Sequence, residues 1–199
     1  MTLSEAFAVF VRYFFILTPF FVVAVFIALT ENETDKVRHD LAIRITAGLC
    51  VLTLLMLFCG EAIFSLFGIT VEAFRVGAGA LLFLSAVSLV NGKVTVPESK
   101  RSIMDLAIVP LAIPVTLGPG AIGVLFVIGS ETSGLRDRLL TCLALLAAVL
   151  CVGAILYLSS ELKRIIGRSG ISMLSKLTGL VLAALSSQMI FSGIATFFK

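Results

Sequence analysis

The chain has 199 residues, of which 59% are hydrophobic and only 14% charged, and its mean hydropathy is +1.15. A soluble domain typically carries about 25% charged residues, so this composition excludes a soluble globular protein and indicates a polytopic membrane protein. The net charge of +3 is small and spread over the connectors, which argues against a nucleic-acid partner.

Six apolar segments are long enough to cross a bilayer, since a spanning helix needs about 20 apolar residues. In chain order they cover residues 5–29, 41–63, 73–91, 104–130, 138–160 and 174–197. The first lacks the basic start and cleavage site of a signal peptide and carries Glu5 and Arg12, so we expect a retained helix. These segments predict one all-α transmembrane domain over residues 1–199.

Lys and Arg are distributed unequally between the two sides that these segments define. The first, third and fifth connectors with their flanks hold ten of the 15 basic residues: Lys36, Arg38, Arg44, Lys93, Lys100, Arg101, Lys163, Arg164, Arg168 and Lys176. Short connectors rich in Lys and Arg stay in the cytoplasm. We therefore predict a multi-pass protein of the inner (plasma) membrane with both termini extracytoplasmic.

The two halves of the chain resemble each other. Residues 17–31 match residues 117–131 at Leu, Pro, Phe and Glu, and the segment from Arg75 resembles the segment from Lys176. Three helices in each half force the second half to insert upside down, which predicts two inverted repeats. The repeats cover about 1–92 and 104–199, with a cytoplasmic linker at about 93–103. Chance similarity between apolar runs is the alternative.

Two prolines, Pro19 and Pro119, lie 100 residues apart in these matching runs. Proline inside a helix removes a backbone donor, and lipid cannot satisfy the groups that it frees. The first and fourth helices are therefore predicted to be discontinuous and to border a protein-lined site. A half-helix starting after Gly120 would present free N–H groups to a carboxylate, and freed carbonyls would hold an ammonium group or a cation. The alternative is a simple kink, because Pro and Gly are frequent in transmembrane helices.

Polar residues near the breaks complete the predicted site. Thr18 and Thr116 flank the two breaks, and Gln188 is the most polar residue deep in the last segment. The predicted substrate-binding residues are Thr18, Pro19, Phe21, Thr116, Gly118, Pro119, Gly120 and Gln188. No Asp, Glu or His lies deep in a segment, which disfavours a proton relay of carboxylates. The coupling cation, sodium or proton, is left open.

Other chemistry finds little support. His39 is the only histidine and lies in a charged connector, so no metal site is expected. The four cysteines lie inside apolar runs and are interpreted as small buried side chains rather than as a redox relay. Nucleotide-binding, hydrolase and metalloprotease motifs are absent, so we expect neither an enzyme nor a cofactor.

The run from Asp105 to Ala121, with its Pro-x-x-x-Pro-x-x-x-Gly-Pro-Gly stretch, resembles the signature of the MarC family, also described as small neutral amino acid transporters. Residues 68–79 and 188–194 are also similar. The resemblance covers nearly the whole chain and implies a six-helix inner-membrane protein that transports glycine, alanine or similar substrates. The usual first-helix motif, Asn-Pro-x-Gly, is replaced here by Thr18-Pro19-Phe20-Phe21, which adds bulk at the first break.

Two functions follow from these features. The first is a transporter of small neutral amino acids that works by alternating access, with the lipid bilayer and the substrate as its partners. The alternative is a non-transporting membrane protein that acts as partner or regulator of another membrane complex, and the bulk of Phe21 favours it slightly. Oligomer formation is left open.

Overall fold

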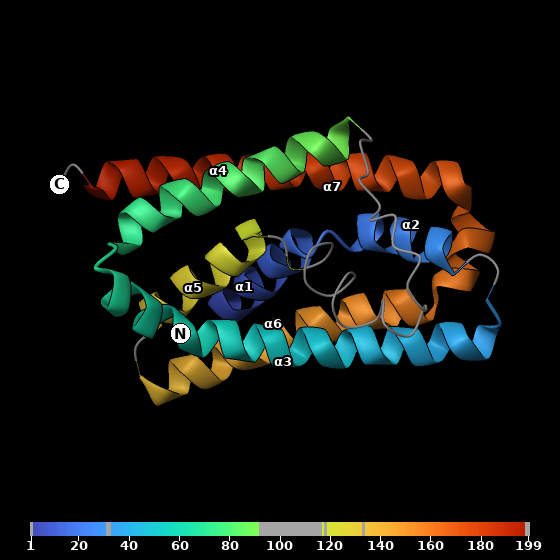
Figure 1. Ribbon diagram of the computed structural model, residues 1–199, viewed down its shortest axis with the longest axis horizontal. Helices are drawn as coiled ribbons and strands as arrows, with labels where there is room; N and C mark the ends of the chain where they lie inside the picture. The colour runs from blue at the N-terminus through green and yellow to red at the C-terminus, as the bar shows by residue number, and fades with distance from the viewer. Residues whose placement is uncertain (1, 31–32, 92–116, 118, 133, 198–199) are drawn as a thin grey trace.

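The computed structural model describes residues 2–30, 33–91, 117, 119–132 and 134–197 (Figure 1). Within these ranges the protein is entirely helical. The predicted linker at 93–103 and most of the fourth apolar segment, including Thr116 and Gly118, lie outside the described residues.

Seven helices cover the described residues. They are α1 (Leu3–Ile16), α2 (Pro19–Leu29), α3 (Asp35–Phe67), α4 (Val71–Val90), α5 (Pro119–Glu131), α6 (Leu135–Tyr157) and α7 (Ser159–Phe197). In the part that is described, five helical stretches are long and apolar enough to cross a membrane, and they overlap five of the six predicted segments. The remaining segment is represented by α5, which is apolar but shorter.

Threonine side chains set several helix starts. The hydroxyl oxygens of Thr34 and Thr70 accept the backbone N–H of Val37 and Ala73, which satisfies a first-turn donor of α3 and of α4. Because Thr34 caps α3, the helix begins at Asp35, earlier than the predicted 41, and takes in most of the charged first connector. Likewise, the predicted connector around residues 163–170 is helical in α7 apart from Gly167, which has a φ of 72°.

The helices form two outer pairs around a middle group (Figure 1). One outer pair is α4 with α7 and the other is α3 with α6; α1, α2 and α5 lie between them. The helix α5 contacts both α3 and α4, while α2 packs on α7 and α1 on α6. Tyr13, Phe26 and Leu125 of the middle group are fully buried, so the core lies where these helices meet the outer pairs.

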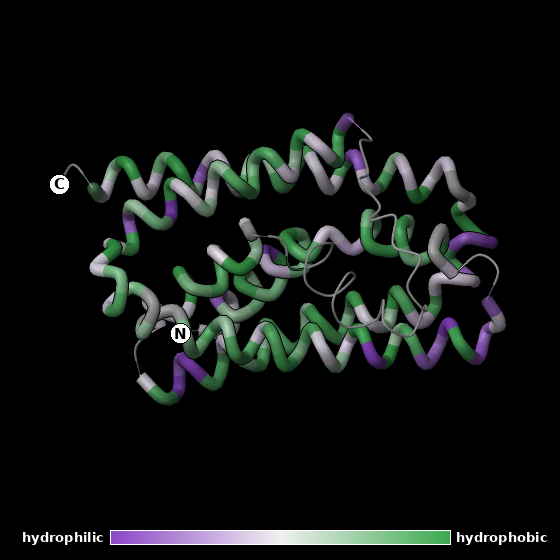
Figure 2. Tube along the Cα trace, viewed as in Figure 1, coloured by the Kyte–Doolittle hydropathy of each residue, from purple (hydrophilic) through white to green (hydrophobic). Residues whose placement is uncertain are grey.

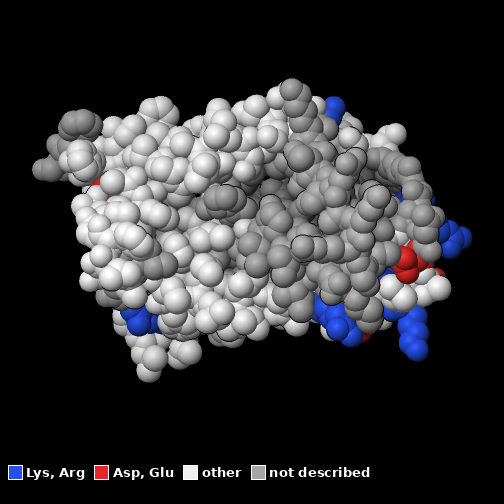
Figure 3. Space-filling view, viewed as in Figure 1, with Lys and Arg blue, Asp and Glu red and all other residues white. Residues whose placement is uncertain are grey.

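Polar and charged residues concentrate at the two ends of the long axis (Figure 2). Among the described residues on the face seen in Figure 3, charged side chains gather mainly toward the right-hand end. Large apolar side chains such as Phe58, Leu84, Leu143 and Phe191 are exposed. An apolar exterior of this extent is typical of a surface that faces lipid, and the protein is therefore an integral multi-pass membrane protein.

Local features recur at nearly constant spacing in the two halves. The helices α2 and α5 begin at Pro19 and Pro119, and α3 and α6 begin at Asp35 and Leu135, each pair 100 residues apart. Gly68, which ends α3, and Gly167, which interrupts α7, both have positive φ values of 62° and 72°. The two halves therefore break and restart their helices at matching places.

Arg38, near the start of α3, ties three helices together at one end of the molecule. Its guanidinium donates to the carbonyl of Thr30 at the end of α2 (2.9 Å) and to the hydroxyl of Ser160 in α7 (2.6 Å). It also pairs with Asp35 at 3.0 Å, and its side chain is only 15% exposed. At the other end, Arg138, 100 residues later, donates to the carbonyl of Thr132 just beyond α5 (3.3 Å).

We predict that Arg38→Ala lowers the free energy of unfolding by about 2 kcal/mol, because it removes charge-assisted hydrogen bonds from poorly hydrated acceptors. Arg44→Ala, on the same helix, serves as the matched control. The Arg44 side chain is 49% exposed and pairs with Asp40, so its loss should cost well under ~1 kcal/mol. Thermal unfolding in detergent, followed by circular dichroism, measures both. Equal effects of the two substitutions would contradict the role given to Arg38.

Candidate functional site

The first helix break lies between α1 and α2. The helix α1 ends at Ile16, α2 begins at Pro19, and Thr18 between them adopts a left-handed conformation (φ 48°, ψ 55°). The N–H of Thr18 donates to the carbonyl of Phe15, and the carbonyl of Thr18 accepts the N–H of Val22, both at 3.0 Å. Pro19 has no N–H, and the Thr18 side chain caps no donor of α2. The N–H groups of Phe20 and Phe21, in the first turn of α2, therefore have no partner from their own helix.

The Thr18 conformation is strained. Among the described residues Thr18 is the only one other than glycine with positive φ. A β-branched side chain clashes with the backbone in this region, whereas Asn tolerates it. An Asn at position 18 would therefore fit the observed backbone better than Thr18 does.

We predict that Thr18→Asn raises the free energy of unfolding by about 1 kcal/mol by relieving this strain. Thr34→Asn is the matched control, because Thr34 caps α3 with an ordinary φ of −71°. Thermal unfolding of both variants should show a gain at position 18 alone. A similar gain at position 34 would attribute the effect to better capping by Asn and would refute the strain.

The second break is described only from Pro119 onward, where α5 begins. Gly120 is buried against α4: a Cβ added there would lie 2.8 Å from the backbone N and Cα of Leu82. Gly123, one turn further along α5, likewise packs on Ala78 of α4. On the side where a Cβ would project, the backbone of α4 leaves no room at Gly120. Its small size therefore serves close helix packing. The expected approach of a ligand to the Gly120 backbone stays a prediction.

We predict that Gly120→Ala lowers the free energy of unfolding by roughly 1–3 kcal/mol, because the new methyl group meets backbone atoms that cannot rotate away. Gly77 offers the matched control on α4, since a Cβ added there meets nothing within 4 Å. Gly77→Ala should be neutral or stabilising, as Ala favours helix more than Gly. Destabilisation by both would point to a general cost of removing glycine rather than to the contact with Leu82.

A cavity of about 160 Å³ lies between α1, α4, α5 and α7. Ile16, two residues before Thr18, and Leu82, the residue on which Gly120 packs, line it together with Val124. The cavity is therefore lined by residues that lie next to both helix breaks. One water needs roughly 10–15 Å³ of such volume, so there is room for a solute of several non-hydrogen atoms.

The polar lining of this cavity comes from residues of both halves. Arg75 of α4 forms an ion pair with Glu131 at the end of α5. Arg12 of α1 and Gln188 of α7 line the same cavity. Ser192 also lines it, although its hydroxyl donates to the carbonyl of Met189 in its own helix (3.0 Å). The cavity thus offers both signs of charge and an amide.

The predicted site residues do not all meet here. Gln188 lines the cavity, although it is exposed rather than buried. Thr18 and Pro19 are buried at the α1–α2 junction, and Phe21 is half-buried against the core. Pro119 begins α5 and Gly120 packs on α4, whereas Thr116 and Gly118 lie outside the described residues.

Three charged residues of the cavity were not among the predicted site residues. Sequence reasoning placed Arg12 near the membrane interface, and read Arg75 and Glu131 as parts of the repeat pattern and of the connectors. The sequence does set Arg12 apart as a candidate, because it is the only Lys or Arg in the first apolar segment. It lies nine residues after the start of α1, roughly two and a half turns along the helix.

Comparison with known proteins identifies the family of this chain. The model of the MarC family integral membrane proteins matches residues 3–198. A UPF0056 membrane protein of Methanocaldococcus jannaschii is 38% identical over 190 residues, which cover 91% of each chain. One of Aquifex aeolicus is 30% identical over 92% of this chain and 89% of its own, and YhcE of Escherichia coli is 28% identical over 96% and 93%. No solved structure matches the chain.

Proposed function

Because the chain belongs to the MarC family of integral membrane proteins, we propose that it is a transporter of small neutral amino acids, such as glycine and alanine, that works by alternating access. The observation that carries the proposal is the cavity between α1, α4, α5 and α7. It is lined by residues of both halves and reaches both helix breaks. Transporters with internal repeats place their substrate sites at such an interface.

The paired features of the two halves support an inverted-repeat architecture. Equivalent helices begin 100 residues apart, and the packing is reciprocal, since α5 packs on α4 while α2 packs on α7. Arg38 and Arg138 bind the carbonyls at the ends of α2 and α5, at opposite ends of the molecule. A two-fold axis in the membrane plane accounts for all three features, and it would allow the halves to exchange roles during transport.

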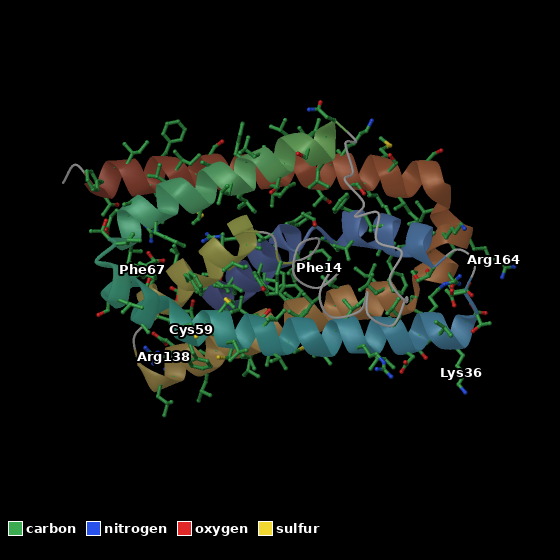
Figure 4. All side chains as sticks on the ribbon, in the orientation of Figure 1. Phe14, Lys36, Cys59, Phe67, Arg138 and Arg164 are labelled. Carbon is green, nitrogen blue, oxygen red and sulfur yellow. The ribbon has the colours of Figure 1, made fainter. Side chains whose placement is uncertain are left out.

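The proposed orientation places the cavity toward the outside of the cell. Both chain termini lie at the same end of the molecule (Figure 1). Lys36 and Arg164 lie at the opposite end, while Arg138 lies on the side of the termini (Figure 4). The excess of Lys and Arg favours a cytoplasmic location for the end with Lys36. Arg75 and Glu131, near the start of α4 and the end of α5, then place the cavity near the extracytoplasmic face of the inner membrane.

The size and polarity of the cavity favour small zwitterions as substrates. Its volume of about 160 Å³ is below the roughly 300–1,000 Å³ that is typical of sites for drug-sized ligands. A solute that carries both an ammonium and a carboxylate matches a lining with both signs of charge. No cofactor takes part in the proposed transport, and on this proposal the chain is not an enzyme.

We predict saturable uptake of labelled glycine and alanine into proteoliposomes that contain the purified protein, and exchange of internal for external substrate. Protein-free liposomes are the control for leakage, and a panel of neutral amino acids as competitors ranks the substrates by size. Imposed sodium and proton gradients, applied separately, identify the coupling cation. Absence of both uptake and exchange across the panel, together with a partner that co-purifies in fixed ratio, would overturn the proposal in favour of a non-transporting partner or regulator.

A further inference from the structure

The charges in the cavity do not cancel. The carboxylate of Glu131 is paired with Arg75, so these two residues contribute no net charge. Arg12 lines the same cavity, and within the described part of the chain it makes no ion pair or hydrogen bond. One positive charge is therefore left without a partner in a cavity that is lined by four helices and open on one side.

An unpaired guanidinium in this position is more than a side chain that extends to the membrane surface. A snorkelling arginine lays its stem along apolar surface and reaches water at the interface. Arg12 is exposed, as a snorkelling arginine is, but it lies on a helix of the middle group and lines a cavity to which α4, α5 and α7 contribute. An ionisable residue directed to a protein-lined cavity at membrane depth is typical of a site on the path of a substrate.

The chemistry of the guanidinium specifies the ligand. Its planar fork of N–H groups matches a carboxylate in a bidentate arrangement, which is shorter and stronger than a neutral hydrogen bond. Gln188, from α7, can supply an amide donor in the same cavity. Because Arg75 already pairs with Glu131, the carboxylate of a solute is the group that meets the unpaired Arg12, whereas a cation without a carboxylate adds to the positive excess.

We propose that Arg12 binds the carboxylate of the transported solute and thereby selects small carboxylate-bearing molecules, amino acids among them. This inference rests on the proposed function for the identity of the solute, but recognition of the carboxylate itself needs no transport. Gln188 is a further donor to the same carboxylate, and the Arg75–Glu131 pair keeps the cavity from attracting a second anion.

Arginine footprinting tests the binding step in the wild-type protein. The purified protein in proteoliposomes is labelled with phenylglyoxal, and mass spectrometry gives the labelling rates of Arg12 and Arg136 in each sample. Arg136 is the internal control, since it is exposed at the start of α6 and does not line the cavity. We expect propionate and alanine to slow labelling of Arg12 severalfold, while ethylamine at equal ionic strength does not and Arg136 stays unchanged. Equal effects on both arginines, or none on Arg12, would overturn the proposal.

Uptake kinetics test the same step in transport. Replacing a charge-assisted bidentate contact by a neutral one should raise the apparent KM of Arg12→Gln for alanine roughly tenfold or more. Arg12→Lys should recover part of the loss, because it keeps the charge but not the fork. Arg136→Gln should behave as the wild type. An unchanged KM for Arg12→Gln in a folded, transporting variant would refute the inference.

The labelling and uptake experiments together distinguish this inference from the proposed function. If propionate protects Arg12 from labelling but no amino acid is taken up, the proposed function is refuted and the carboxylate site is supported. If alanine is taken up, Arg12 is not protected from labelling and the KM of Arg12→Gln is unchanged, the carboxylate site is refuted and the proposed function is supported.

Discussion

The need to satisfy backbone hydrogen bonds away from water governs this structure. Lipid cannot supply partners for the groups that Pro19 and Pro119 free, so both breaks must lie inside the protein. The helices that carry them, α1, α2 and α5, accordingly form the middle group, and the outer pairs α4–α7 and α3–α6 shield them. Most of the exposed large apolar side chains lie on the long helices α3, α4, α6 and α7, of which α7 is interrupted at Gly167. The position of the cavity follows, because it borders the breaks from the protein side.

Close approach of the helices depends on small residues, since apolar burial alone does not drive helices together in lipid. Gly120 and Gly123 bring α5 against α4, and Gly79, Gly179 and Gly193 bring α4 against α7. A Cβ at any of these positions would lie within 3.0 Å of a neighbouring atom. A hydrogen bond between the hydroxyls of Tyr13 and Thr53 (2.9 Å) joins α1 to α3. The walls of the cavity are therefore set by close contacts between backbones.

Hydropathy and proline placement predict the helical class, most of the spans and the break at Thr18, because these depend on local composition alone. Helix ends are less predictable: the cap of Thr34 extends α3 into a charged segment that composition assigns to a connector. The site is the hardest part. Gly120 suggests access for a ligand when only its own segment is considered, and its close packing on Leu82 of α4 becomes visible only in the folded chain. The position of Arg12 beside a cavity depends on three other helices, which no local sequence pattern reveals.

The matched arginines at the two ends are not equivalent in this conformation. Arg38 reaches Ser160, 122 residues away in the other half, and so joins the halves at the end that the Lys and Arg excess assigns to the cytoplasm. At the opposite end, the hydrogen bond from Arg138 to Thr132 stays within its own half, and the cavity lies near that end. The Arg75–Glu131 ion pair also joins the two halves, at the end where the cavity lies. Contacts between the halves therefore occur toward both ends of the molecule. Under the proposed mechanism, opening toward either side breaks the contact between the halves on that side: Arg38–Ser160 at one end and Arg75–Glu131 at the other.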